Sequence, residues 1–168
     1  MLRRVAPRLV VIDPAMRIAE VECFNHIARQ SSVACTYHLP AMFGMQSLLA
    51  EDMQQACGMI ILGSAASVHE RSAWQLAFEA WLLPYLQKGI PTLGLCYGHQ
   101  MLAHMFGGRV DYIFPDRHKY AGVREIEMSA LPWHPAARGS VVVSHCEAVT
   151  SVPSDMQVIA RSPEVTID

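Results

Sequence analysis

One stretch of this chain limits the folds open to it: a buried strand that runs into a tight turn and then a helix. Ile90–Leu93 is a short apolar run, and Met101–Phe106 is an apolar helical stretch closed by two glycines. Between them, Gly94-Leu95-Cys96-Tyr97-Gly98 places a cysteine two residues from a glycine on each side. This is the spacing of the G-x-S-x-G nucleophile elbow, with sulfur in place of oxygen. The pattern predicts a strand–turn–helix unit with Cys96 at the turn.

The spacing has a steric reason and a chemical consequence. A side chain on so tight a turn needs small neighbours, so that the strand and the helix can close around it. The turn also places the sulfur at a helix N-terminus, where unpaired N–H groups and the helix dipole favour thiolate over thiol. A buried structural cysteine is the alternative. Packing alone requires neither flanking glycine, so we expect Cys96 to be a nucleophile.

Short apolar runs alternate with helical patterns through the first part of the chain. Strands are expected at Arg8–Asp13, Ser32–Leu39 and Gly58–Leu62. Pro14 is well placed to begin a helix, and Met42–Ala56 is expected to be loop and helix. A further helix carries one apolar face, and its Pro84 is expected to kink or end it. The residues of that face are Trp74, Phe78, Trp81, Leu82 and Tyr85.

After Gly108 the pattern changes to strands without long helices between them. These strands are expected at Arg109–Tyr112, Val123–Met128, Ser140–His145 and Gln157–Arg161. Strands that alternate with helices indicate a doubly wound parallel sheet. The sequence therefore predicts one α/β domain over residues 1–168, with a three-layer, mostly parallel sheet, Cys96 after a central strand, and a small antiparallel flank.

Composition narrows the classes of function. Apolar residues make up 52% and charged residues 17% of the chain, which favours a sheet buried on both faces or a surface covered by something else. A net charge of −2 argues against nucleic acid as a partner. No apolar run is long enough to span a membrane. The cysteines are odd in number and match no metal site, which favours reduced thiols, a cytoplasmic location and no metal.

Residues Gly94–Gln100, followed by Leu102-Ala103 and Gly107-Gly108, closely resemble the nucleophile segment of class I (triad-type) glutamine amidotransferases. The likeness is nearest to stand-alone proteins similar to the amidotransferase domain of GMP synthase. It implies a flavodoxin-like fold and hydrolysis of the glutamine side-chain amide through a Cys96 glutamyl thioester, giving glutamate and ammonia. It implies no cofactor. It leaves room for a synthetase or other ammonia-accepting partner and for a homo-oligomer.

The resemblance also assigns an oxyanion loop. Residues Leu62–Val68 match the family's loop, with Ser64 at the position of its second glycine and Ala65 at that of its proline. The backbone N–H groups of Ser64 and Tyr97 are the implied oxyanion donors. Gly63 is implied to bind the substrate. An ordinary strand-to-helix connection is the alternative.

Two further segments are implied to bind glutamine. Gln100 matches the family's substrate-binding glutamine, although a solvated helix residue is the alternative. Ser144-His145-Cys146-Glu147 resembles the Ser-His-Gly-Asp segment that holds the α-amino and α-carboxylate groups, with Cys146 in place of glycine. A strand end and turn is the alternative there. His99 is expected to be structural, because a residue three positions after the nucleophile is poorly placed to reach back to it.

The catalytic base is not identified in this sequence. The family carries it on a His-x-Glu segment beyond the strand that matches Gln157–Arg161, and this sequence ends before that point. Trp133-His134-Pro135-Ala136 lacks the glutamate and comes too early. We therefore expect a missing C-terminal part, or else a degenerate amidotransferase that binds a partner without catalysis. A γ-glutamyl peptidase-type cysteine hydrolase is a further alternative.

Overall fold

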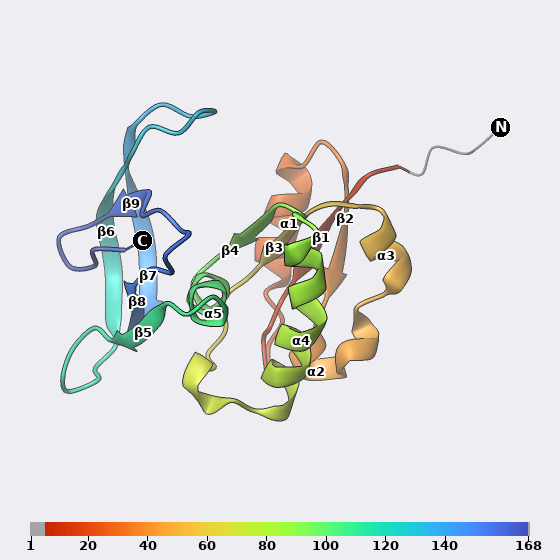
Figure 1. Ribbon diagram of the computed structural model, residues 1–168, viewed down its shortest axis with the longest axis horizontal. Helices are drawn as coiled ribbons and strands as arrows, with labels where there is room; N and C mark the ends of the chain where they lie inside the picture. The colour runs from red at the N-terminus through yellow and green to blue at the C-terminus, as the bar shows by residue number, and fades with distance from the viewer. Residues whose placement is uncertain (1–5, 168) are drawn as a thin grey trace. The chain divides into compact units, whose positions relative to one another are not determined.

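The computed structural model describes residues 6–167 of the chain. The chain divides into two compact units, Met1–His99 and Gln100–Asp168, with the division inside helix α5 (Tyr97–Met105) (Figure 1). The expectation of one domain over residues 1–168 remains a prediction.

The first unit is built on a four-stranded parallel sheet. Its strands lie in the order β2-β1-β3-β4, and every neighbouring pair is parallel. The bounds are Arg8–Ile12 for β1, Ala34–His38 for β2, Ala56–Ile61 for β3 and Thr92–Gly94 for β4. The predicted α/β architecture with a parallel sheet is confirmed.

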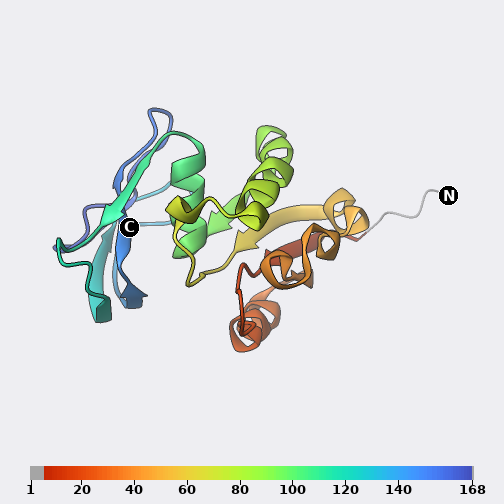
Figure 2. The ribbon, with the colours of Figure 1, turned by 90° about the horizontal axis from the view of Figure 1, so that it is seen from below.

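The apolar runs of β1 and β3 form the centre of this unit. Val10, Val11 and Ile12 are completely buried, and Ile61 matches them on the neighbouring strand. Both faces of these strands are covered, which is why their sequences are continuously apolar rather than alternating. Figure 2 shows helices α1 (Val21–Gln30) and α4 (Ala73–Gln87) on opposite faces of the sheet.

Shorter elements join these strands. The connection from β2 to β3 contains α2 (Pro40–Phe43), the 3-10 turn η1 (Met45–Ser47) and α3 (Ala50–Gln54). Between β3 and α4 lies a second 3-10 turn, η2 (Val68–Glu70). The apolar face predicted for α4 is confirmed, since Phe78 and Leu82 are fully buried.

The prediction that Pro14 begins a helix is wrong, and Pro84 does not end α4. Helix α1 begins at Val21, because the buried Asp13 carboxylate accepts hydrogen bonds from the backbone N–H groups of Ala15 (2.9 Å) and Glu20 (2.7 Å) and holds the intervening chain as a loop. Helix α4 continues through Pro84 to Gln87. Pro84 is exposed, so water can satisfy the carbonyl that a proline leaves without its helical donor.

The position expected for Cys96 in the sheet also needs correction. Strand β4 ends the sheet order, so among the described residues Cys96 follows an edge strand rather than a central one. After α5 the chain does not return to this sheet, because every later strand of the described chain belongs to the antiparallel sheets of the second unit.

The second unit contains two small antiparallel sheets. Strand β5 (Arg109–Tyr112) pairs with β8 (Glu147–Ser151). Strand β6 (Tyr120–Met128) lies between β7 (Ala137–His145) and β9 (Ala160–Arg161). The predicted antiparallel flank is confirmed, although the last strand is only two residues long because it pairs only with the end of β6. Within residues 6–167 no helix is both long and apolar enough to cross a membrane.

Candidate active site

The predicted turn is present at Cys96. Cys96 has a φ of +52°, in the left-handed region that residues other than glycine rarely adopt. Leu95 N–H donates to the Ile61 carbonyl at 2.8 Å, and Gly98 N–H donates to the Leu95 carbonyl at 2.9 Å. Helix α5 begins at Tyr97, directly after the cysteine. Non-glycine residues in such conformations concentrate at functional sites, and Cys96 is exposed at this one.

Both glycines of the motif are required by contacts with main-chain atoms. A Cβ placed on Gly94 would lie 2.4 Å from the carbonyl carbon of Gly98. A Cβ placed on Gly98 would lie 2.4 Å from the carbonyl oxygen of Ile61. Backbone cannot yield as the end of a flexible side chain can. The glycines therefore allow β4, the turn and α5 to close against β3.

The loop after β3 passes beside the nucleophile. A Cβ placed on Gly63 would lie 3.5 Å from the Cβ of Cys96 and 3.8 Å from its Sγ. The main chain of the segment predicted as an oxyanion loop therefore passes beside the Cys96 side chain at Gly63. The first unit places Gly63 beside Cys96, with Ser64 and Tyr97 next to them along the chain. The catalytic and substrate-binding roles of these residues remain predictions.

The Ser64 side chain fastens this loop to the chain after β1. Its hydroxyl donates to the Pro14 carbonyl at 2.8 Å and accepts from the Ala66 N–H at 3.2 Å. Asp13, which holds the loop that contains Pro14, is completely buried. The serine at this position therefore links two loops through its side chain, while its backbone N–H is the predicted oxyanion donor.

We expect Ser64→Ala to lower the free energy of unfolding by about 1–3 kcal/mol, the usual net value of two hydrogen bonds. The loss arises because the Pro14 carbonyl and the Ala66 N–H both lose the hydroxyl. Urea unfolding measures it. Ser154→Ala is the control, since the exposed Ser154 hydroxyl donates to the adjacent, exposed Asp155 rather than to a distant segment. Equal stability of the two variants would contradict the link.

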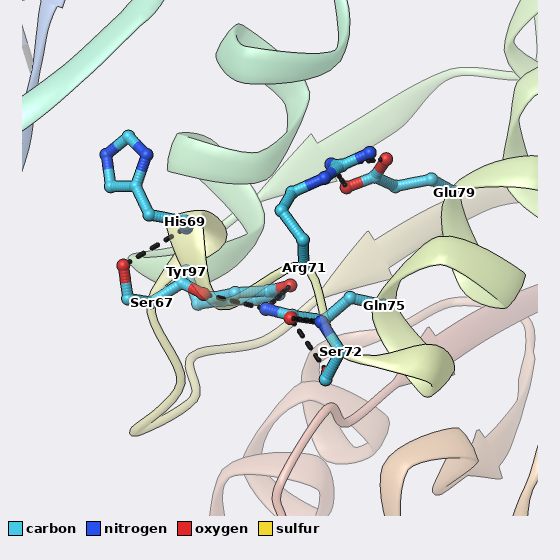
Figure 3. A network of polar contacts seen from close by, with 7 residues as sticks. All are labelled: Ser67, His69, Arg71, Ser72, Gln75, Glu79 and Tyr97. Carbon is cyan, nitrogen blue, oxygen red and sulfur yellow. Dashed lines mark hydrogen bonds and ion pairs between the residues drawn. The ribbon is translucent and has the colours of Figure 1, made fainter.

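A buried hydrogen-bond network lies behind the turn, and the sequence analysis missed it (Figure 3). The side-chain nitrogen of Gln75 donates to the Ser67 carbonyl at 2.7 Å and to the Tyr97 hydroxyl at 3.1 Å. Its oxygen accepts from the N–H and the hydroxyl of Ser72, each at 2.8 Å. Gln75 and Tyr97 are each only 1% exposed. A signal existed, because Gln75 falls on the buried face of α4, three residues before Phe78.

Burial raises the pKa of the Tyr97 hydroxyl to about 12, and the hydrogen bond from Gln75 opposes part of this rise. The phenol is therefore neutral at physiological pH and can keep its place in the network. A folded-state pKa above the ordinary value of about 10 means that the unfolded chain loses its proton first as the pH rises.

The free energy of unfolding should therefore fall between about pH 10 and pH 12, by about 2–3 kcal/mol from Tyr97 alone. Tyr37 also has a raised pKa, chiefly through burial, and adds to the fall in every variant that retains it. The comparison is therefore between the wild type and Tyr97→Phe, each unfolded in urea at pH 9 and at pH 12. If the free energy of unfolding of the wild type and of Tyr97→Phe fell by the same amount between pH 9 and pH 12, a buried, neutral Tyr97 would be contradicted.

The second unit gathers the other predicted site residues. The Glu147 carbonyl accepts a hydrogen bond from Gln100 Nε2 at 2.7 Å and lies 2.6 Å from His145 Nδ1. Gln100 is buried, whereas Ser144 is exposed and Cys146 is half-buried. The amide of Gln100 thus holds the turn at Ser144–Glu147. The roles of Gln100, Ser144, His145 and Cys146 in binding substrate remain predictions.

Other candidate groups have simpler descriptions. His134 lies in the connection between β6 and β7, with Nδ1 2.7 Å from the Pro135 carbonyl. The five cysteines all lie in the described part of the chain and form no disulfide. Residues 6–167 contain no group of three His, Cys, Asp or Glu side chains arranged to hold a metal ion.

A family model and two named relatives indicate the same family for this chain. The family model described as "Glutamine amidotransferase class-I" matches residues 24–167. A protein of Aeropyrum pernix named GMP synthase (glutamine-hydrolyzing) is 32% identical over 157 residues, which are 89% of this chain and 26% of that protein. Another of the same name, from Thermomicrobium roseum, is 39% identical over 110 residues, which are 62% of this chain and 19% of that protein.

Solved structures show the same fold. A glutamine amidotransferase of Thermotoga maritima superimposes with a TM-score of 0.76 at 20% identity, over 97% of this chain and 70% of the other. A protein of Thermoplasma acidophilum described as a putative GMP synthase subunit gives a TM-score of 0.73 at 16% identity, over 98% of this chain and 77% of the other. The chain thus spans about a quarter or less of these two curated relatives and about three quarters of these two structures.

Proposed function

Because the chain belongs to the class I glutamine amidotransferase family, we propose that Cys96 attacks the side-chain amide of glutamine and releases ammonia. The observation that supports this most strongly is the geometry at the turn. Cys96 is exposed, is held in a left-handed conformation at the start of α5, and has the main chain of Gly63 beside its sulfur.

The reaction divides into two steps. The Cys96 sulfur forms a bond to the side-chain carbonyl carbon of glutamine, and the carbonyl oxygen becomes negatively charged. The N–H of Tyr97, which has no acceptor within α5 because it belongs to the first turn, and the N–H of Ser64 stabilise that oxygen. The C–N bond then breaks and ammonia leaves with the proton that the thiol gave up. Water attacks the resulting thioester, glutamate departs and the thiol is regenerated.

A base must carry the thiol proton to the departing nitrogen. The family resemblance gives this role to a His-x-Glu segment that follows the last strand, and no histidine follows His145 in this sequence. We therefore propose residues of this chain as the nucleophile and the oxyanion donors, and we propose none of its residues as the base.

The family resemblance assigns the amino-acid end of glutamine to Gln100, Ser144, His145 and Cys146, and we propose these residues as its contacts. The Glu147 carbonyl holds the turn through Gln100 and His145. Within this turn Ser144 is exposed and Cys146 is half-buried.

The proposed acceptor of ammonia is a synthetase. The curated relatives are named GMP synthase and are much longer than this chain. A synthetase on a partner protein is consistent with that difference. The thiol state of all five cysteines supports a cytoplasmic location.

The test measures ammonia and glutamate released from glutamine, with γ-glutamyl dipeptides as competing substrates. We expect release from glutamine to depend on Cys96 and to exceed cleavage of the dipeptides. Faster cleavage of the dipeptides would favour a γ-glutamyl peptidase instead.

A further inference from the structure

We propose that Gln75 is a positioning residue that holds the two proposed oxyanion-donor segments in a fixed arrangement. One segment is the loop from Gly63 to Ser67, and the other is the start of α5 at Tyr97. This inference rests on the proposed function, because it concerns the negative charge that forms on the substrate carbonyl oxygen in the proposed reaction.

The hydrogen bonds of Gln75 reach three separate segments. Its nitrogen donates to the Ser67 carbonyl, at the end of the loop that carries Ser64, and to the hydroxyl of Tyr97. Its oxygen accepts from Ser72, at the N-terminus of α4. Figure 3 shows the Gln75 amide between these partners, with Ser67 and Tyr97 contacted by the same nitrogen.

Helix capping explains only half of this arrangement. Ser72 and Gln75 form a capping box, in which the side chain at the third helical position accepts from the residue before the helix. That role uses the amide oxygen alone. The nitrogen makes two further bonds, and the whole side chain is 1% exposed. The Gln75 amide therefore caps α4 with its oxygen and also links two other segments with its nitrogen.

The two proposed oxyanion donors come from different loops of the first unit. The Ser64 N–H comes from the loop after β3, and the Tyr97 N–H comes from the turn after β4, so no local turn fixes one relative to the other. Oxyanion donors are effective when their positions are set before the reaction. Ser67 is itself held by a capping box, since its side chain accepts from His69 N–H at 3.2 Å and its N–H donates to Glu70 at 3.0 Å. Gln75 joins that ordered loop to the ring of Tyr97.

The chain offers variants that separate positioning from stability. Gln75→Met keeps the length of the side chain and removes all four hydrogen bonds. Tyr97→Phe removes one of the two bonds made by the nitrogen. Ser72→Ala removes one contact to the amide oxygen and weakens the cap, while both bonds of the nitrogen remain. Ser72→Ala is therefore the matched control for a loss of helix stability.

The experiment follows covalent labelling of Cys96 by a glutamine analogue that carries a chloroketone in place of the amide. Attack on that ketone needs the oxyanion donors, whereas displacement by iodoacetamide does not. For each variant, the maximal labelling rate and the half-saturating concentration are measured with the analogue, and the second-order rate is measured with iodoacetamide.

We expect Gln75→Met to lower the maximal labelling rate by about tenfold or more, since loss of one whole oxyanion donor costs about 10²- to 10³-fold. The half-saturating concentration and the iodoacetamide rate should each change by less than about twofold. Tyr97→Phe should also lower the maximal labelling rate, by a smaller factor, and leave the other two quantities nearly unchanged. It serves as the test variant if Gln75→Met does not fold. Ser72→Ala should label like the wild type.

The outcomes separate the two proposals. If the wild type is labelled saturably and Gln75→Met and Tyr97→Phe label equally fast, the role of Gln75 is overturned and the proposed function stands. An equal loss in Ser72→Ala, or an equal loss of the iodoacetamide rate, also overturns it, because either result means general damage. If the analogue does not label the wild type while iodoacetamide does, the proposed function fails and the role of Gln75 fails with it.

Discussion

Replacing Gly98 with alanine is expected to lower the free energy of unfolding of the first unit by about 3 kcal/mol or more, or to prevent its folding, because overpacking against backbone cannot relax cheaply. The added Cβ would lie 2.4 Å from the Ile61 carbonyl oxygen, 2.9 Å from its Cβ and 3.0 Å from its carbonyl carbon. Ile61 is completely buried on β3, so it has no room to withdraw. Chemical denaturation followed by circular dichroism measures the loss.

Gly58→Ala is the matched control for that substitution. Gly58 lies on the same strand as Ile61, and an added Cβ there would meet its nearest atom, the Pro91 carbonyl oxygen, at 3.4 Å. We expect this variant to stay within about 1 kcal/mol of the wild type. If Gly98→Ala were as stable as Gly58→Ala, the steric explanation of the motif would be wrong.

Replacing Cys96 with serine is expected to lower the release of ammonia from glutamine by at least about a thousandfold, as the loss of a catalytic nucleophile typically does. Serine keeps the size of the side chain and the conformation of the turn but is a far weaker nucleophile without a strong base. Cys57→Ser is the control, because Cys57 is also exposed and lies on β3, away from the turn, with its sulfur donating to the Arg8 carbonyl. Equal loss in both variants, or activity retained in Cys96→Ser, would contradict the proposed role.

Much of the first unit could be predicted from the sequence, for physical reasons. Strands buried on both faces are continuously apolar, so β1 and β3 stood out, and a cysteine between two glycines indicated the turn. Strands β5, β6 and β7 were also predicted, whereas β8 was not, because the sequence there was assigned to a substrate-binding segment or a turn. Their ends were less predictable, because β9 depends on pairing with the end of β6 rather than on its own residues.

The features that were missed depend on contacts between distant segments. Pro14 suggested a helix start, but the Asp13 carboxylate holds the following residues as a loop. Gln75 reads as an ordinary capping residue, and only the fold shows that its nitrogen meets Ser67 and Tyr97. The edge position of β4 likewise follows from strand pairing, which the local sequence of β4 does not encode.

Peptide mapping after brief exposure of the protein to the glutamine chloroketone asks whether Cys96 is the nucleophile. We expect that Cys96 alone is modified, that the rate saturates with the analogue, and that free glutamine protects against it. Cys23 and Cys57 provide the internal comparison, since both are exposed thiols outside the turn. Modification of these cysteines at the same rate as Cys96, or an unmodified Cys96 in the folded protein, would contradict the claim that this turn presents a nucleophile for the amide of glutamine.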